Sequence, residues 1–434
     1  MMTRAIRGRL VSFTGDPAHD AGAVRYRPDG VVVIDEGGRI SAVGEAGELL
    51  PGLPPQTPVD HFPDDLILPG LIDTHIHYVQ VEAIASYGAQ LLDWLNNYAF
   101  VAELKFADPA VAARQATFFL DELLRNGTTT ALIYCSVHPQ SAEALFAEAA
   151  RRHMGVIAGK VMMDRNAPAA LTDTAQSSYD DSKALIGRWH GRDRLRYAIT
   201  PRFAITSTPE QLEAAATLKR EHPDCHVQTH LSENLDEIAT TLRLYPEATS
   251  YTDVYHRYGL LGPRTVLGHC IHLGEGEREM LSATRSVAAF CPTSNLFLGS
   301  GLFDYAAMTD SRRPVRVAIA SDVGGGTSYS MLQTANEAYK VLALRGIKLP
   351  GCRAFHMMTR GNAEALGLEQ EIGSLEAGRY ADLVVLDARA TPAMRRRMAA
   401  VADRLDEELF VLMMMGDDRS VKATYVRGEP AKLA

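Results

Sequence analysis

The chain of 434 residues is long enough for one large domain together with a smaller one. Hydrophobic residues make up 46% of it and charged residues 22%, which is typical of a globular protein and argues against a disordered or low-complexity chain. The net charge of -9, with acidic and basic residues well mixed, argues against a nucleic-acid-binding face, because such a face requires a basic stripe.

The sequence also carries signals about the cellular compartment. No stretch approaches the roughly 18 apolar residues of a membrane span, and the first residues contain no apolar core of signal-peptide length. The cysteines are odd in number, scattered and never in CxxC spacing. We therefore expect a reduced, cytoplasmic protein.

Strand-like apolar runs, most of them followed by helix-like stretches, recur along the middle of the chain. The runs cover residues 66–77, 128–135, 155–164, 195–203, 226–233, 265–270, 286–294 and 315–322. Between them lie patterns such as "PAVAARQATFFLDELLRNG", with apolar residues at helical spacing and a terminal glycine. Eight strand–helix units predict an α/β fold, a parallel (β/α)8 TIM-type barrel over residues 66–372.

The two ends of the chain have a different pattern. Residues 1–65 and 373–434 contain short β signals with glycine turns, such as "GVVVIDEGGRISAVG" and "ADLVVLD". We interpret these segments as one small β-sandwich domain formed by both termini, with the barrel inserted between them. Residues 388–412 receive no predicted role.

Polar residues at the ends of the predicted barrel strands suggest a metal site, because barrel enzymes carry their chemistry at the carboxyl ends of the strands. The first run ends with His75 and His77, which face the same side because side chains alternate along a strand. The fifth, sixth and eighth runs end near His230, His269 and Asp322. Any one of these residues alone could be an ordinary hydrogen-bonded group, but together they predict a site for zinc, with iron as the alternative.

One metal ion is expected rather than two. A second metal would need a bridging ligand, commonly a modified lysine. The fourth run ends at Arg202, whose guanidinium stays protonated and does not bind metal. Lys160 is expected inside the third run rather than at its end. The remaining histidines fall mostly in helix or loop patterns and are expected at the surface.

Two further motifs lie beside these ligands. Glu233 follows His230 by three residues and can face a substrate and move a proton, although a glutamate favoured by a helix N-terminus is the alternative. Three glycines follow Asp322 in "SDVGGGTSYS" and would let the backbone approach a ligand closely. A phosphate loop is excluded because no GK[ST] follows them.

Several stretches together resemble the amidohydrolase superfamily, in the guanine deaminase group of its one-metal deaminase branch. They are "LPGLIDTHIHYVQ", "LLDWLNNYAFVAE", "NGTTTAL", "TPRFAITS", "HLSEN", "CPTSNLFLGSGLF", "SDVGGGTSYSML" and "GDDRSVKATYVRGE". "PGLIDTHIH" is common to the superfamily, whereas "HYVQ", "TPRF" and "SDVGGG" indicate guanine. The resemblance implies a zinc-dependent hydrolase, a homodimer, that converts guanine to xanthine and ammonia with a metal-activated water.

The resemblance also implies roles for individual residues. The metal ligands would be His75, His77, His230 and Asp322, and the proton shuttle would be Glu233. The purine would be contacted by Gln80, Arg202, Phe203 and His230.

Chemical reasoning agrees with these roles. Asp322 can take a proton from the attacking water, Glu233 can protonate N3 and help the amine to leave, and His269 can orient the water. Arg202 can donate to O6 of guanine, which adenine lacks, and Gln80 can both donate and accept.

Phe203 and Trp94 can stack on the purine. A structural salt bridge is the alternative for Arg202, and core packing is the alternative for Trp94.

Two other functions remain open at this point. One is a related deaminase or chlorohydrolase acting on 8-oxoguanine, a pterin or a triazine. The other is a catalytically inactive scaffold on the same fold.

Overall fold

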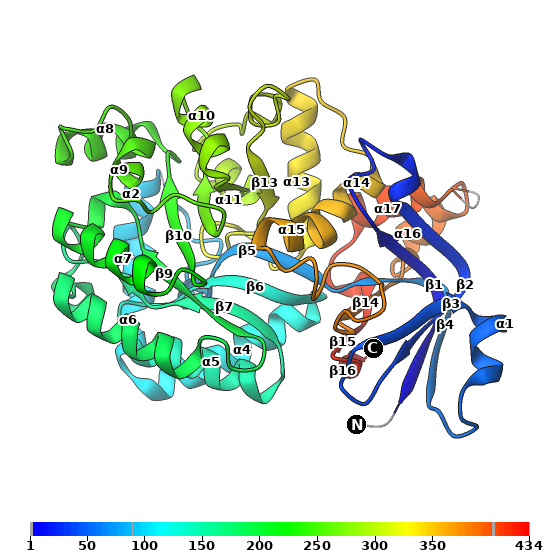
Figure 1. Cartoon of the computed structure of the whole chain (residues 1–434). Coiled ribbons are helices and arrows are strands. Elements are labelled where there is room, and N and C mark those ends of the chain that lie inside the picture. Colours follow the sequence, from blue (N-terminus) through cyan, green and yellow to red (C-terminus); the bar gives the residue numbers. More distant parts are fainter. Residues whose placement is uncertain (1–2, 89, 402–403, 434) are drawn as a thin grey trace. The chain divides into compact units, whose positions relative to one another are not determined.

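The computed structural model describes residues 3–88, 90–401 and 404–433, and it divides into two compact units (Figure 1). The first unit comprises the chain up to Asp73, Asp121–Thr130 and the chain from Tyr329 onward. The second comprises Thr74–Leu120 and Ala131–Ser328. The carboxyl ends of all barrel strands lie in the second unit. The domain boundaries after residues 65 and 372 stay a prediction.

Eight parallel strands form a nearly closed barrel, as predicted (Figure 1). They are β5 (Leu71–His77), β6 (Thr128–Tyr134), β7 (Gly155–Gly159), β9 (Leu195–Pro201), β10 (His226–Leu231), β11 (Thr265–His269), β12 (Val287–Phe290) and β13 (Arg316–Ile319). A short strand, β8 (Val161–Met162), pairs with β9. Strands that follow one another in the chain are neighbours in the sheet, which is the arrangement of successive βα units.

Backbone hydrogen bonds join the segment after β13 to β5. The Asp322 N–H donates to the His75 carbonyl at 2.9 Å, and the His77 N–H donates to the Val323 carbonyl at 3.2 Å. These two bonds bring the first and last strands of the barrel together at their carboxyl ends. The first and eighth strand ends therefore share one face of the barrel.

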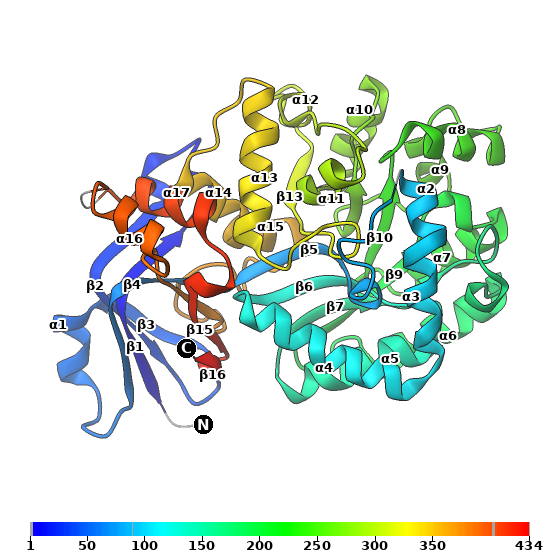
Figure 2. The ribbon, with the colours of Figure 1, turned by 180° about the vertical axis from the view of Figure 1, so that it is seen from behind.

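Helices alternate with the strands along the chain (Figure 2). The longer ones are α4 (Pro109–Arg125), α5 (Pro139–Arg151), α6 (Ala175–Trp189), α7 (Pro209–Glu221), α8 (Leu235–Leu244), α10 (Glu275–Thr284), α13 (Met331–Leu344) and α17 (Leu405–Met415). In α4, Ala112, Ala116, Phe119 and Leu123 are fully buried, which is the helical spacing that the sequence shows.

Shorter helices complete the chain. They are α1 (Ala46–Leu49), α2 (Leu91–Trp94), α3 (Phe100–Leu104), α9 (Tyr251–Arg257), α11 (Pro292–Phe297), α12 (Tyr305–Met308), α14 (Gly351–His356), α15 (Asn362–Leu366) and α16 (Pro392–Met398). Residues 388–412, which received no predicted role, contain α16 and the start of α17, and residues 402 and 403 lie outside the described part. Across the described residues, no helix combines the length and apolar character that a bilayer span needs.

The strands from the two termini form one separate sheet, in the order β16-β15-β14-β4-β1-β2-β3. Their bounds are β1 (Arg4–Phe13), β2 (Val24–Ile34), β3 (Ile40–Glu45), β4 (Val59–Pro69), β14 (Leu383–Leu386), β15 (Val421–Val426) and β16 (Glu429–Leu433). Ile6 and Val32 share one apolar cluster with Val385 and Tyr425. Strands from both chain ends thus share one core, as predicted for a domain formed by both termini, and they belong to one seven-stranded sheet.

The first predicted run, residues 66–77, is two strands rather than one. It is divided at Gly70, where β4 of the terminal sheet ends and β5 of the barrel begins. A Cβ atom on Gly70 would collide with the side chain of Thr129, so glycine permits this close crossing. The sequence hides the change of sheet because both strands are buried here and present the same apolar pattern.

Two smaller expectations were wrong. Lys160 lies just after β7 rather than inside a strand, and its ammonium pairs with Asp173 Oδ2 at 2.5 Å. His226 and His356 are buried rather than at the surface. Lys160 is also absent from the residues that line the pocket described below.

Candidate active site

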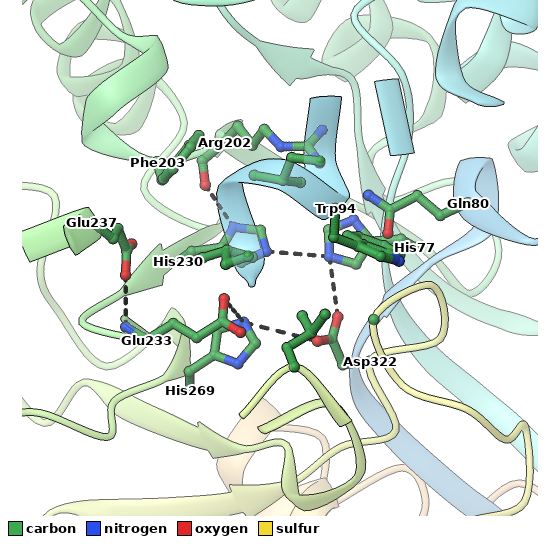
Figure 3. A pocket seen from close by; sticks show the side chains of 14 residues that line it. His77, Gln80, Trp94, Arg202, Phe203, His230, Glu233, Glu237, His269 and Asp322 are labelled. Atoms are coloured by element: carbon green, nitrogen blue, oxygen red, sulfur yellow. Dashed lines mark hydrogen bonds and ion pairs between the residues drawn. The ribbon is translucent and has the colours of Figure 1, made fainter. Parts of the chain in front are cut away.

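The predicted site residues come together at the carboxyl ends of the barrel strands (Figure 3). His75 and His77 lie on β5 and are buried. His230 is the penultimate residue of β10, His269 is the last residue of β11, and Asp322 follows β13 by three residues. Five side chains that are distant in the sequence therefore meet in one unit of the structure.

The donor atoms of the four predicted ligands lie close to one another. His75 Nε2 and His77 Nε2 are 3.3 Å apart, and His77 Nε2 is 3.2 Å from His230 Nε2. Asp322 Oδ1 lies 3.4 Å from His75 Nε2 and 3.3 Å from His77 Nε2. A tetrahedral site with bonds of about 2.0–2.1 Å has ligand atoms about 3.3–3.4 Å apart, so these separations fit a zinc-sized ion.

Hydrogen bonding fixes the tautomer of His230. Its Nδ1 lies 2.7 Å from the carbonyl oxygen of Arg202, and a carbonyl can only accept, so Nδ1 carries the hydrogen. Burial, together with the neighbouring His75 and His77, holds the pKa of His230 well below 6.5. Its Nε2 therefore presents a lone pair toward His77, as a metal ligand must.

Two of the other donors, His77 and Asp322, are in the protonation states that metal binding needs. Burial lowers the pKa of His77 to about 3, although Asp322 opposes that shift, so the imidazole is neutral. Burial alone would raise the pKa of Asp322, but hydrogen bonds with His75 and His77 hold it well below 3.8. A neutral imidazole and a carboxylate are both able to donate a lone pair to a cation.

The backbone is strained where these side chains are presented. Ser232, His269 and Asp322 have φ values of +51°, +71° and +52°. Left-handed conformations cost non-glycine residues on the order of 1–3 kcal/mol each and cluster at functional sites. The strain lies at or within three residues of three strand ends, and two of these residues, His269 and Asp322, line the pocket.

Glu233 lies in the loop between β10 and α8, with its carboxyl group inside the pocket (Figure 3). Its Oε1 accepts a hydrogen bond from Ser300 Oγ at 2.9 Å, and its Oε2 lies 3.3 Å from His269 Nε2. Burial, reinforced by the charge of Asp322, raises the pKa of Glu233 to about 8. Glu233 therefore carries a proton at neutral pH.

His269 is held from behind by Asn295. The Nδ1 of His269 lies 2.9 Å from Asn295 Oδ1, in a hydrogen bond that the ring donates. The Nε2 of His269 is then an acceptor, which suits the protonated carboxyl group of Glu233 opposite it. Asp322 Oδ2 is 3.9 Å from the same nitrogen.

Arg202 and Gln80 reach the same pocket, and a third residue joins them. Arg202 Nη1 lies 2.8 Å from both carboxylate oxygens of Glu103, and Gln80 Nε2 donates to Glu103 Oε1 at 2.8 Å. The salt bridge that was the alternative for Arg202 thus exists, yet Arg202 also lines the pocket.

Apolar residues form the rest of the pocket, whose empty space, including the part that is open to solvent, is about 410 Å³. Phe203 and Trp94 line it, and both are buried. Trp94 also packs in a core cluster, as its alternative interpretation predicted, and its stacking on a purine stays a prediction. A π-helical segment, Leu95–Ala99, joins α2 to α3 beside the pocket, and such segments occur frequently at functional sites.

The glycines after Asp322 serve two purposes. Gly325 lines the pocket, as the sequence suggested. A Cβ atom on Gly324, whose φ is +122°, would collide with Oε1 of Gln80. Gly324 therefore makes room for a pocket residue rather than for a ligand.

The sequence interpretation missed several residues of this site. They are Glu103, Tyr134, Glu237, Asn295 and Ser300. Glu103 belongs to the quoted stretch "LLDWLNNYAFVAE", where a carboxylate in the largely apolar segment "YAFVAE" could have drawn attention. Glu237 accepts hydrogen bonds from the Glu233 and Asn234 N–H groups at 2.7 and 3.0 Å. Tyr134 stacks on His77 at 4.4 Å between ring centroids.

Comparisons with known proteins agree with this geometry. The amidohydrolase family matches residues 66–431. The guanine deaminase of Escherichia coli (strain K12) is 49% identical over 428 residues, which is 98% of this chain and 97% of that protein. The solved structure of E. coli guanine deaminase matches with a TM-score of 0.95 at 47% identity, over 100% of both chains. Guanine deaminase from C. acetobutylicum, solved with bound guanine in the active site, matches with a TM-score of 0.87 at 28% identity over 99% of both chains. The chain therefore belongs to the amidohydrolase family.

Proposed function

We propose that this protein is a guanine deaminase, which hydrolyses guanine to xanthine and ammonia. The observation that carries the proposal is the buried Glu233 carboxyl group, which shares one pocket with three imidazoles, those of His77, His230 and His269, and the carboxylate of Asp322. The guanine deaminases to which the chain is similar support the choice of substrate.

We further propose that one zinc ion binds per chain. His75, His77, His230 and Asp322 would hold it, because their donor atoms have the separations and protonation states described above. When bound, such an ion lowers the pKa of a water molecule and makes it a nucleophile at neutral pH.

The chain's own residues manage the protons of the reaction. Asp322 accepts one proton from the attacking water, while Glu233 gives its proton to N3 of the purine. The oxygen forms its bond at C2. The Glu233 carboxylate then takes the remaining proton from the oxygen at C2 and delivers it to the amino group, so that the C2–N bond breaks, the C2–oxygen double bond forms and ammonia leaves. The proton held by Asp322 then passes to Glu233, which restores the starting state. His269, whose Nε2 accepts, orients the water beside Asp322.

Residues on the other side of the pocket recognise the base. Arg202 donates to O6 of guanine, and Gln80 contacts the neighbouring edge of the ring. Phe203 and Trp94 cover the flat faces of the purine. His230 lies between the two groups of residues and contacts the purine as well as the metal.

Two measurements on the purified protein test this function together. Conversion of guanine to xanthine is followed by absorbance with ammonia release in parallel, and bound metal is determined by elemental analysis. We expect turnover of guanine and about one zinc per chain. Turnover of 8-oxoguanine, a pterin or a triazine in place of guanine would reassign the substrate. A metal-free protein that releases no ammonia from any of these compounds would instead be an inactive scaffold.

We also propose a cytoplasmic homodimer. The arguments are the family resemblance for the dimer, and for the cytoplasm the cysteine pattern, with no disulfide among the five cysteines of the described chain. Sedimentation at micromolar concentration measures the oligomeric state, and a species of one chain mass would overturn the dimer.

A further inference from the structure

Glu103 contacts the two polar residues on the recognition side of the pocket, Gln80 and Arg202. It is fully buried on α3, and its carboxylate holds both Gln80 and Arg202. These two partners come from different parts of the barrel, since Gln80 follows β5 and Arg202 follows β9. One carboxylate therefore sets the position of both polar groups that would read the base.

The carboxylate decides which way the Gln80 amide points. An ionised carboxylate can only accept hydrogen bonds, so Gln80 must turn its nitrogen toward Glu103. The amide oxygen is then on the other side, next to Gly324. On the side away from Glu103, Gln80 thus presents its amide oxygen, which is a hydrogen-bond acceptor.

The same carboxylate orients Arg202. Both short contacts with Glu103 involve Nη1, and among the described residues no hydrogen-bond partner is assigned to Arg202 Nε or Nη2. The guanidinium is therefore neutralised on one side and keeps donors for a ligand on the other. A buried arginine without such a partner would carry a large desolvation cost.

A fixed acceptor beside fixed donors matches one edge of guanine. Guanine carries a hydrogen on N1, which can donate to Gln80 Oε1, and an oxygen at C6, which can accept from Arg202. Adenine presents the reverse pattern, a bare N1 and an amino group. Figure 3 shows Arg202 and Gln80 on one side of the pocket and Glu233 on the other, which suits N1 and N3 on either side of the reacting C2.

We infer that Glu103 is a positioning residue that makes the pocket selective for a 6-oxo purine with a hydrogen on N1. This inference deepens the proposed function and rests on it for the placement of the base. Glu103 does not touch the purine itself. It acts by holding the Gln80 amide in one orientation and Arg202 in one position.

Binding of two unreactive purines tests the inference. Hypoxanthine has the O6 and N1–H groups and purine has neither, and both lack the amino group at C2. Their dissociation constants are measured by calorimetry for the metal-loaded wild type and for Glu103→Gln. We expect the wild type to prefer hypoxanthine by about tenfold or more, the value of one hydrogen bond to a charged group. In Glu103→Gln the preference should fall to about threefold or less, with bound metal unchanged.

A matched control separates positioning from general stability. Asp173→Asn removes the carboxylate from another buried ion pair of the same barrel, that with Lys160, outside the pocket. It should lower the melting temperature but keep the preference for hypoxanthine. Equal loss of affinity for both purines in Glu103→Gln, or an unchanged preference, would overturn the inference.

Two further variants keep the test decisive if Glu103→Gln does not fold. Glu103→Gln combined with Arg202→Met removes both buried charges and should fold without any preference for hypoxanthine. Glu103→Asp keeps the charge and should retain part of the preference for hypoxanthine over purine. A full preference for hypoxanthine in the double variant would contradict the inference. If the wild type prefers hypoxanthine but does not turn over guanine, the proposed function is rejected, whereas the inference about Glu103 still stands.

Discussion

Two of the places where histidine and acidic side chains come together in the described part of the barrel unit differ in what their histidine nitrogens can do. One is the predicted ligand set at the strand ends. The other is His190, Asp224 and Cys225, whose potential ligand atoms also lie within 4.8 Å of one another. Proximity alone does not distinguish the two groups.

The backbone around each imidazole makes the difference. In the second cluster the Tyr197 N–H donates to His190 Nδ1 at 3.0 Å, so the hydrogen of the neutral ring is on Nε2, which lies 3.1 Å from Asp224 Oδ2. Burial raises the pKa of Cys225 to about 12, which keeps it a thiol. His230 has the opposite tautomer because a carbonyl faces its Nδ1. Whether a histidine can bind a metal ion thus depends on the hydrogen-bond partner of its other ring nitrogen as much as on the position of the ligand nitrogen.

The largest expected effect comes from breaking the first cluster. Asp322→Asn and His230→Ala should both lose bound metal and lower kcat about 10³-fold or more, because the enzyme loses the several kcal/mol by which the metal stabilises the transition state. Elemental analysis and the guanine assay measure the two properties. Full metal content and activity in both variants would show that these residues are not ligands.

The next effect separates proton transfer from metal binding. Glu233→Gln keeps the size of the side chain but cannot release or take up the proton, so kcat should fall about 10²–10⁴-fold. Bound metal and hypoxanthine affinity should stay at the wild-type level. Near wild-type kcat in this variant would remove Glu233 from the mechanism.

A smaller effect is expected on the recognition side. Arg202→Met should lower kcat/KM for guanine more than about tenfold. It also leaves the Glu103 carboxylate buried without its cation, which costs about 3–5 kcal/mol of stability. Thermal unfolding and kcat/KM for guanine and adenine are measured side by side. An unchanged preference for guanine over adenine would mean that O6 is read elsewhere, with Gln80 the next candidate.

The smallest effect is expected in the second cluster, which comprises His190, Asp224 and Cys225. His190→Ala should leave bound metal and kcat/KM for guanine unchanged, because His190 offers no lone pair to an ion. Asp224 is largely exposed, so the lost ion pair should cost about 1 kcal/mol or less. A second metal equivalent that disappears in His190→Ala would show that this cluster binds an ion after all.

Much of this architecture could be predicted because it depends on local periodicity. Alternation along β5 places His75 and His77 on one side, and the recurring strand–helix pattern gives the barrel. In a parallel barrel the carboxyl ends of the strands lie on one face, so residues at separate strand ends must converge. The predicted ligands and Glu233 come together for that reason.

Only the tertiary structure decided which groups are partners. Glu103 lies on a helix far in sequence from Arg202, and Ser300 lies in a loop far from Glu233, so no local pattern connects them. Likewise the break at Gly70 depends on contact with Thr129, and the change of sheet leaves no mark in an apolar run that is buried on both sides. The sequence by itself determined the fold class and the residues at the strand ends, because strand periodicity and barrel closure are repeated local rules. Tautomers, buried ion pairs and the direction of the Gln80 amide were decided only in the folded chain, because each depends on a hydrogen-bond partner that folding brings from elsewhere in the sequence.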